Sequence, residues 1–276
     1  MTFRETAAMT STAASAVQPR ILLSPLRYRS TPQIDLRYWV AISLASVFGC
    51  NLGDFVSLYL HLGHWVGLFP LAAAFIALVV CERRSVRASE GWYWAIVIVL
   101  RTAATNLADL ATHTFGLPYP WVIAFLELLQ VLVILPVGPR LSGAKAEASR
   151  PAADGWYWAS LLTAGALGTA IGDGVAEDLH LGTGLGTLAL GAFALLAIKL
   201  GAPSGWSTKA GYWLAIIAVR AAGTTAGDWL AFRDSGGLVN GLHLGLALST
   251  GCTGGVFALT LLLWRPKSTA STAPQP

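Results

Sequence analysis

The sequence predicts an all-α integral membrane protein with eight transmembrane helices, arranged as four parallel tandem two-helix repeats in two pseudo-equivalent halves. Three observations lead to this prediction. First, the 276 residues are 55% hydrophobic and only 12% charged, with a mean hydropathy of +0.60, which is typical of membrane proteins. Second, a tyrosine-tryptophan pair recurs four times at a fixed distance from an aspartate. Third, apolar stretches of about 20 residues, the length that crosses a bilayer, follow one another along the chain.

The repeated unit has the pattern Y-W-x9-[GA]-x3-[GA]-D. Its second copy lies in the stretch from Gly91 to Asp109 and ends at Asp109. The four copies join Trp39 to Asp54, Trp94 to Asp109, Trp158 to Asp173 and Trp213 to Asp228. A spacing that is kept four times marks an internal repeat. The two small residues before each aspartate are expected to let helix backbones approach closely in a membrane.

The apolar stretches predict four helix pairs with short connections inside each pair and longer, basic connections between pairs. The predicted pairs are Tyr38–Leu60 with Trp65–Cys81, Trp92–Thr112 with Trp121–Val137, Trp156–Leu179 with Leu185–Leu200, and Tyr212–Phe232 with Leu238–Trp264. Residues 35–265 are therefore predicted to form a single membrane domain, with repeats at about 37–84, 90–138, 154–201 and 210–265. Residues 1–34 and 266–276 are predicted to be disordered cytoplasmic tails.

The positions of the basic residues predict the orientation in the membrane. Lysines and arginines gather in the tails and between the pairs, whereas Arg233 stands alone on the opposite side. By the positive-inside rule both termini are cytoplasmic, so the net charge of +4 reflects membrane orientation and not nucleic-acid binding. The tyrosine-tryptophan pairs then lie at the cytoplasmic interface, where we interpret the tryptophans as interfacial anchors.

Two helices per repeat require all four repeats to enter the membrane in the same direction. The four aspartates should therefore share one depth, about 22 Å along the helix from the tryptophans. An ionisable group inside a bilayer is costly and usually faces a partner or a water-filled cavity. The candidates for a cation or substrate pathway are Asp54, Asp109, Asp173, Asp228, Thr105, Thr169, Thr224, Asn51, Asn106, Arg101, Arg220, Glu127 and Glu177.

Several of these candidates are predicted to share helix faces. Arg101, Thr105 and Asp109 are spaced by four residues, as are their counterparts that end at Asp228. In the odd repeats a shared L-H-L-G ending places His61 after Asp54 and His180 after Asp173, on a face predicted to continue that of the aspartate. The four aspartates are the predicted metal ligands, with His61 and His180 as further candidates.

Four converging carboxylates cannot all ionise in a low dielectric without a counter-charge. Three compensations remain open: Arg101 and Arg220 neutralise two of them, some carboxyls stay protonated, or a cation binds. Carboxylate, hydroxyl and amide oxygens suit Mg²⁺, Ca²⁺ or Mn²⁺, whereas the histidines and Cys50 would admit a softer ion such as Zn²⁺.

The sequence carries no Walker loop, G-x-S-x-G elbow, H-E-x-x-H or dinucleotide fingerprint, so we predict neither an enzyme nor a bound cofactor. An intramembrane enzyme is disfavoured because Cys50 and His61 lie far apart along one helix. The leading hypothesis is a secondary transporter of a cation, either a divalent metal or a proton-coupled substrate. The alternative is a non-transporting scaffold or partner-binding subunit with structural Asp, Arg and Thr cross-links. The expected partners are the lipid bilayer and a small cation or small solute, and the oligomeric state stays open.

The repeats resemble bacterial membrane proteins that are built from a repeat of unknown function. The matching stretches are RYWVAISLASVFGCNLGDF, GWYWAIVIVLRTAATNLADL, GWYWASLLTAGALGTAIGDG and GYWLAIIAVRAAGTTAGDW, and the resemblance covers about residues 37–265. It implies the four-repeat architecture and a bacterial inner-membrane location, but no activity. Ala108 departs from the usual glycine before the aspartate and still permits close packing.

Overall fold

The computed structural model describes residues 31–85, 89–135, 153–201, 209–233, 239 and 241–264. Within these ranges the chain forms eight α-helices and two π-helical turns, with no strand. The all-α class is therefore confirmed. The predicted C-terminal tail, most of the predicted N-terminal tail and the basic segment between the second and third pairs lie outside the described residues.

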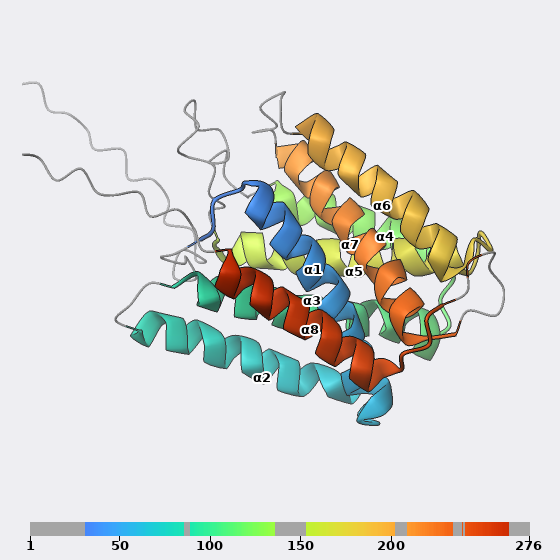
Figure 1. Ribbon diagram of the computed structural model, residues 1–276, viewed down its shortest axis with the longest axis horizontal. Coiled ribbons are helices and arrows are strands. Elements are labelled where there is room, and N and C mark those ends of the chain that lie inside the picture. Colours follow the sequence, from blue (N-terminus) through green and yellow to red (C-terminus); the bar gives the residue numbers. More distant parts are fainter. Residues whose placement is uncertain are drawn as a thin grey trace, which may run out of the picture.

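The helices form an inner ring and an outer layer (Figure 1). The inner helices carry the tyrosine-tryptophan pattern: α1 (Leu36–Asp54), α3 (Glu90–Asp109), α5 (Gly155–Ala176) and α7 (Lys209–Ala231). Each inner helix packs against two others, in the cyclic order α1, α3, α5, α7. The outer helices are α2 (Gly63–Arg84), α4 (Tyr119–Ile134), α6 (Gly182–Gly201) and α8 (Leu246–Leu263).

Each outer helix packs more extensively on the inner helix of the following pair than on that of its own pair. Thus α2 packs on α3, α4 on α5, α6 on α7, and α8 returns to α1. A hydrogen bond from Thr250 Oγ1 to the carbonyl oxygen of Asn51 (3.1 Å) fixes α8 against α1. The last helix therefore closes the ring against the first.

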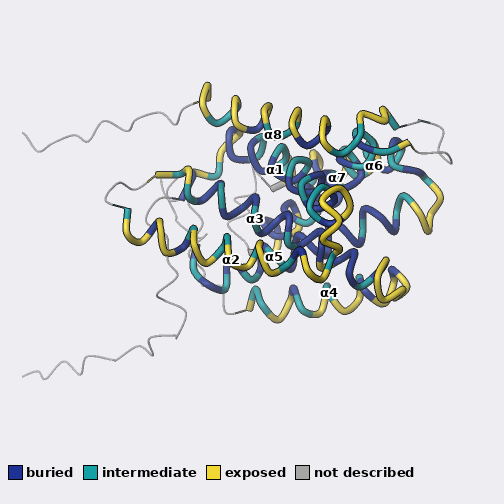
Figure 2. The backbone as a smooth tube through the Cα atoms, turned by 90° about the horizontal axis from the view of Figure 1, so that it is seen from below, coloured by how far each residue is buried: buried dark blue, intermediate teal, exposed yellow. Residues whose placement is uncertain are grey.

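Burial separates the two layers (Figure 2). The most apolar windows of α1, α3 and α5 are 56–72% buried, but those of α2, α6 and α8 are only 11–17% buried. Together with the π-helical turns that extend α1 and α3, these six helices are long and apolar enough to cross a membrane, which indicates a membrane protein. α4 is apolar but has only 16 residues, and α7 carries Arg220 and Asp228 in the centre of the ring, where protein contacts replace lipid.

Short polar residues begin three of the inner helices. The side chains of Asp35 and Asp154 accept hydrogen bonds from the backbone N–H groups of Tyr38 and Tyr157, each at 2.9 Å, and Ser89 accepts one at its own helix start. These are N-caps, which satisfy donors that have no partner inside the helix. In these three helices the cap residue lies three or four residues before the tyrosine.

The four tyrosines point inward and their hydroxyl groups close a ring. The oxygen–oxygen distances are 3.3 Å from Tyr38 to Tyr93, 2.6 Å from Tyr93 to Tyr157, 2.9 Å from Tyr157 to Tyr212 and 2.5 Å from Tyr212 back to Tyr38. All four side chains are at most 4% exposed. Because each hydroxyl can donate one bond and accept another, the ring satisfies four buried polar groups at once.

The interpretation of the tryptophans as interfacial anchors is wrong for three of the four. Trp94, Trp158 and Trp213 are each 2% exposed and belong to the main hydrophobic cluster, and Trp39 is partly buried. Each ring packs edge-on or tilted against the tyrosines, as in the contacts of Trp94 with Tyr38 and Tyr93. The tryptophans therefore pack around the tyrosine ring, at the end of the bundle where the inner helices begin.

The opposite end departs from regular α-helix. π-helical turns follow Asp54 and Asp109, at Phe55–Tyr59 and Leu110–Thr114. Beyond the inner helices, left-handed backbone occurs at His61, His180 and His243, and at the glycine before each outer helix (φ +66° to +78°). Gly63, Gly116, Gly182 and Gly245 adopt this conformation without a Cβ penalty.

The sequence L-H-L-G of repeats one and three occurs a third time, at Leu242–Gly245 in the fourth repeat. In the first and third repeats the histidine lies seven residues after the aspartate, but His243 lies fifteen residues after Asp228. The predicted start of the last helix at Leu238 is therefore wrong, because α8 begins at Leu246. Residues 241–245 are not helical, and the N–H of Leu242 donates to the carbonyl of Trp229 (2.7 Å).

Replacement of Tyr212 by phenylalanine should open the hydroxyl ring, because it leaves the buried hydroxyls of Tyr38 and Tyr157 one partner short. We expect the free energy of unfolding to fall by about 1–3 kcal/mol, measured by denaturation in mixed micelles. Tyr59→Phe is the matched control, since Tyr59 is 54% exposed and lies outside the ring. Equal stability of Tyr212→Phe and the control would contradict a structural role for the ring.

Candidate functional site

A cavity of about 440 Å³ lies between the inner helices, on the side of the hairpin turns. Its wall includes two layers that the repeat pattern placed at one register: Asp54, Asp109, Asp173 and Asp228, and one turn earlier Cys50, Thr105, Thr169 and Thr224. Leu58, His64, His113, Ala176, Glu177, Gly182, Thr183, Phe232 and Arg233 line its outer part. All four aspartates thus meet in one site.

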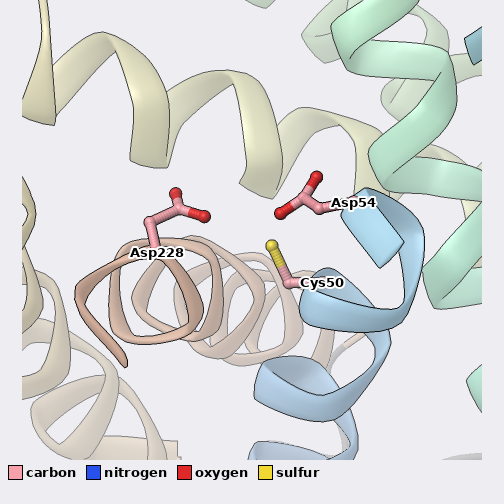
Figure 3. A group of neighbouring side chains, drawn as sticks. All are labelled: Cys50, Asp54 and Asp228. Carbon is pink, nitrogen blue, oxygen red and sulfur yellow. The ribbon is translucent and has the colours of Figure 1, made fainter. Parts of the chain in front are cut away.

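The aspartates are buried but have few donors. Asp54, Asp109 and Asp173 are 6–8% exposed, and Asp228 is partly buried. The carboxyl groups of Asp54, Asp173 and Asp228 have no hydrogen-bond partner among the described residues. The carboxyl oxygen Oδ1 of Asp109 lies 3.8 Å from His113 Nδ1. Figure 3 shows the carboxyl groups of Asp54 and Asp228 pointing toward the thiol of Cys50 between them. Carboxylates that are this buried normally accept hydrogen bonds or bind cations.

Arg101 lies behind the threonines that line the inner end of the cavity. Its Nη1 donates to Thr105 (2.9 Å) and Thr169 (2.7 Å), and its Nη2 donates to Thr224 (2.6 Å). Longer bonds reach the carbonyl oxygens of Ser46 and Arg220. The guanidinium group therefore holds three inner helices together through the threonine layer, and forms no ion pair with an aspartate among the described residues.

Arg220 occupies the corresponding position in α7 but is bonded differently. It is 0% exposed, yet none of its three guanidinium nitrogens has a hydrogen-bond partner within the described ranges. The corresponding residues in α1 and α5 are Ser46 and Gly165, whose small size leaves room for two long side chains at the same level. The prediction that both arginines compensate the aspartates thus remains a prediction. Of the two guanidinium groups, that of Arg101 is hydrogen-bonded to residues that line the cavity, and that of Arg220 is not bonded to any described residue.

The outer part of the cavity has a polar side formed by α3, α5 and their connections. Four residues after each aspartate stand Leu58, His113, Glu177 and Phe232. His113 Nε2 lies 3.7 Å from Glu177 Oε1, and the hydroxyl of Tyr119 donates to Glu177 Oε2 (3.0 Å). The pKa of Glu177 lies below its ordinary value because His113, and then Tyr119, stabilise its carboxylate against partial burial.

The cavity is therefore divided into two chemically different halves. Asp109 and Asp173 lie beneath the titratable pair of His113 and Glu177. Asp54 and Asp228 lie beside Cys50, beneath the apolar side chains of Leu58 and Phe232. One half lies between α3 and α5 and the other between α1 and α7. Each half therefore joins an odd repeat to an even one, whereas Arg101 and Arg220 distinguish the two even repeats from the two odd ones.

Several predicted site residues do not line this cavity. His61 and His180 are exposed in the turns, because the π-helical turn after Asp54 and the end of α5 at Ala176 break the periodicity that would carry a histidine onto the aspartate face. Glu127 is exposed on the outer face of α4. Asn51 and Asn106 are 0% exposed and lie between helices, where they approach Gly227 and Gly67.

His64 and His113 line the cavity although they were not among the predicted site residues. The signal for His113 was present, because it follows Asp109 by four residues and the helix continues through this segment as a π-helical turn. His64 gave no such signal, since it begins an outer helix. Its Nδ1 lies 3.1 Å from Thr114 Oγ1, which brings it to the same rim.

A repeat family described as Repeat of Unknown Function (DUF347) matches residues 211–267, which correspond to the fourth repeat. This similarity supports a chain that contains a repeat of unknown function. No curated protein and no solved structure matched the chain.

The two buried arginines provide a matched pair of substitutions. Arg101→Met removes five hydrogen bonds and should destabilise the protein by about 3 kcal/mol or more. Arg220→Met removes a buried cation with no partner among the described residues, so we expect unchanged or increased stability. Thermal unfolding in detergent would measure both variants, and an equal loss for the two would contradict this assignment.

Proposed function

We propose that the chain is a secondary transporter of a small cation, either a divalent metal ion or a proton-coupled substrate, in the bacterial inner membrane. In this proposal all eight helices cross the bilayer as four parallel two-helix repeats, with both termini in the cytoplasm. The observation that carries the proposal is the cavity in which four aspartates meet, three of them buried and Asp228 partly buried. The carboxyl groups of Asp54, Asp173 and Asp228 have no donor among the described residues. Such a group is costly in a membrane unless it binds a cation or protons.

The position of the cavity supports an alternating pathway. Its wall reaches His113 and Glu177, whose side chains are 48% and 57% exposed, so it opens at the end with the hairpin turns. Toward the other end it meets Arg101, which is 1% exposed, and beyond it the inner helices begin at the tyrosine ring. In the proposed orientation the aspartates face the non-cytoplasmic side, and transport requires the arginine and tyrosine layers to separate.

The arrangement also supports coupling to protons. Carboxyl groups that lose a cation can take up protons in its place, and the buried layer offers four such groups. Glu177 and His113 stand between the solvent-exposed rim and Asp109, at distances that a small side-chain movement or one water molecule would bridge. A proton gradient would then drive the cation, as expected for a chain without an ATP-binding motif.

A second candidate is a scaffold in which these polar groups only cross-link helices. The bonds from Arg101 to three threonines and the closed tyrosine ring favour it, since both join helices without requiring a ligand. The two candidates differ at the aspartates, because the scaffold gives no role to a carboxylate that lacks a donor.

Flux in proteoliposomes tests the proposal. The full chain is reconstituted with an imposed proton gradient, and uptake of Mn²⁺, Zn²⁺ and Cd²⁺ is followed with an internal indicator. Asp54→Asn, Asp109→Asn, Asp173→Asn and Asp228→Asn should each reduce the rate at least tenfold, because an amide cannot supply the negative charge.

Asp178→Asn is the matched control, since Asp178 is exposed beyond the end of α5 and does not line the cavity. Wild-type rates in all four aspartate variants would rule out the transport proposal. The scaffold instead predicts that these variants lose thermal stability and that no cation raises the melting temperature of the wild-type chain.

A further inference from the structure

We propose that Cys50, Asp54 and Asp228 form a metal site that selects divalent ions able to accept a thiolate, such as Zn²⁺, Co²⁺ or Cd²⁺, over Mg²⁺ and Ca²⁺. This inference rests on the proposed function, because it names the class of cation that the aspartate cavity takes. It concerns the half of the cavity between α1 and α7, and leaves Asp109, His113 and Glu177 on the other side to protons.

The geometry brings three ligand atoms together. The thiol of Cys50 and one carboxylate oxygen each from Asp54 and Asp228 all lie within 4.8 Å of one another. Figure 3 shows the three side chains converging from two helices. Bond lengths to Zn²⁺ are about 2.3 Å for sulfur and about 2.0–2.2 Å for oxygen, so two ligand atoms of one tetrahedral ion lie about 3.3–3.7 Å apart. Side-chain movements of about 1 Å would bring the three ligand atoms to these separations.

An independent observation points to a ligand in the same place. Asp173, which is not one of the three, is 8% exposed, lines the same cavity and has no hydrogen-bond partner among the described residues. A polar side chain that is buried to this degree is normally satisfied. It is available as a fourth ligand, which would complete the coordination number usual for Zn²⁺.

The sulfur atom distinguishes this half of the cavity from the other positions of its layer. Thr105, Thr169 and Thr224 all accept hydrogen bonds from Arg101, so their oxygens are already occupied. Cys50 stands at the corresponding position in α1, is 1% exposed and makes no hydrogen bond within the described ranges. A thiolate favours borderline and soft ions and contributes little to the binding of Mg²⁺ or Ca²⁺.

Direct metal binding to the full chain in detergent tests this site. The protein carries Cys81→Ser and Cys252→Ser, which remove the two exposed thiols and leave Cys50 as the only one. Titration with Co²⁺ or Cd²⁺ should produce thiolate-to-metal charge-transfer absorption that saturates at one ion per chain. Cys50→Thr, which restores the residue found in the other three repeats, should abolish this absorption and weaken Cd²⁺ binding at least tenfold.

Competition then measures the selectivity. Zn²⁺ should displace bound Co²⁺, whereas Mg²⁺ and Ca²⁺ at a hundredfold higher concentration should not. Metal should also protect Cys50 from a membrane-permeant maleimide in the protein that retains Cys50, a measurement that needs no substitution in the site.

Charge-transfer absorption that persists in Cys50→Thr, or maleimide labelling that Cd²⁺ does not slow, would overturn the proposed site. Binding of Mg²⁺ as tight as that of Zn²⁺ would overturn the selectivity. If the site binds metal as expected but no ion crosses proteoliposomes, the transport proposal fails and the metal site stands. If Mn²⁺ is transported while no thiolate absorption appears, the proposed metal site fails and the transport proposal stands.

Discussion

The close approach of the four inner helices is the constraint on which the rest of the structure depends. Each approach is possible because a glycine or alanine of one helix faces a larger residue of the next. A Cβ added at Gly49 would lie 2.5 Å from Arg101 Cγ, and one at Gly172 would lie 2.9 Å from Thr224 Cβ. Gly223 faces Ser46 in the same way, which closes the ring from α7 to α1. The small pairs of α1, α5 and α7 thus receive polar residues of a neighbouring helix, whereas Ala104 of α3 meets Gly165 of α5.

This packing explains why the polar groups gather in layers. Four helices that begin at capped tyrosines and approach one another at small residues carry their hydroxyl, guanidinium, threonine and aspartate groups at matching heights. Helices without these close contacts would pay the same desolvation cost to bury the polar groups but would not bring the groups together. Satisfaction is complete at the tyrosine ring and at Arg101, and it fails at the aspartates. Arg220 also lacks a partner among the described residues but is 0% exposed, whereas the aspartate layer opens to solvent, which is where a ligand can enter.

The sequence predicted the layers better than the direction in which side chains point. The fixed spacing from tryptophan to aspartate was enough to place four aspartates at one register, because helical rise depends little on surroundings. It could not reveal that the tyrosines converge and that the tryptophans pack around them, since a largely apolar helix has no strong face. The sequence also predicted, wrongly, that His61 and His180 lie on the same helix face as the aspartates. An i→i+5 turn and left-handed residues change the periodicity there. His64 reaches the rim through an outer helix, and contacts between different pairs leave no mark in local sequence.

Charge balance links the two halves of the cavity. The inner part of the cavity carries the four aspartate carboxyl groups above the guanidinium group of Arg101, and in its outer part Glu177 and Arg233 carry opposite charges. If the cavity stays neutral in both of its states, three carboxyl protons are bound when no metal is present. A divalent ion then leaves room for only one of these protons, so its entry must release two. If Cys50 ionises, it releases one proton and adds one negative charge. One more carboxyl group then keeps its proton, so the total number of released protons stays at two. The pair of His113 and Glu177 lies on the opposite side of the cavity from Cys50, Asp54 and Asp228. Protons and metal can therefore leave along different sides of the same cavity.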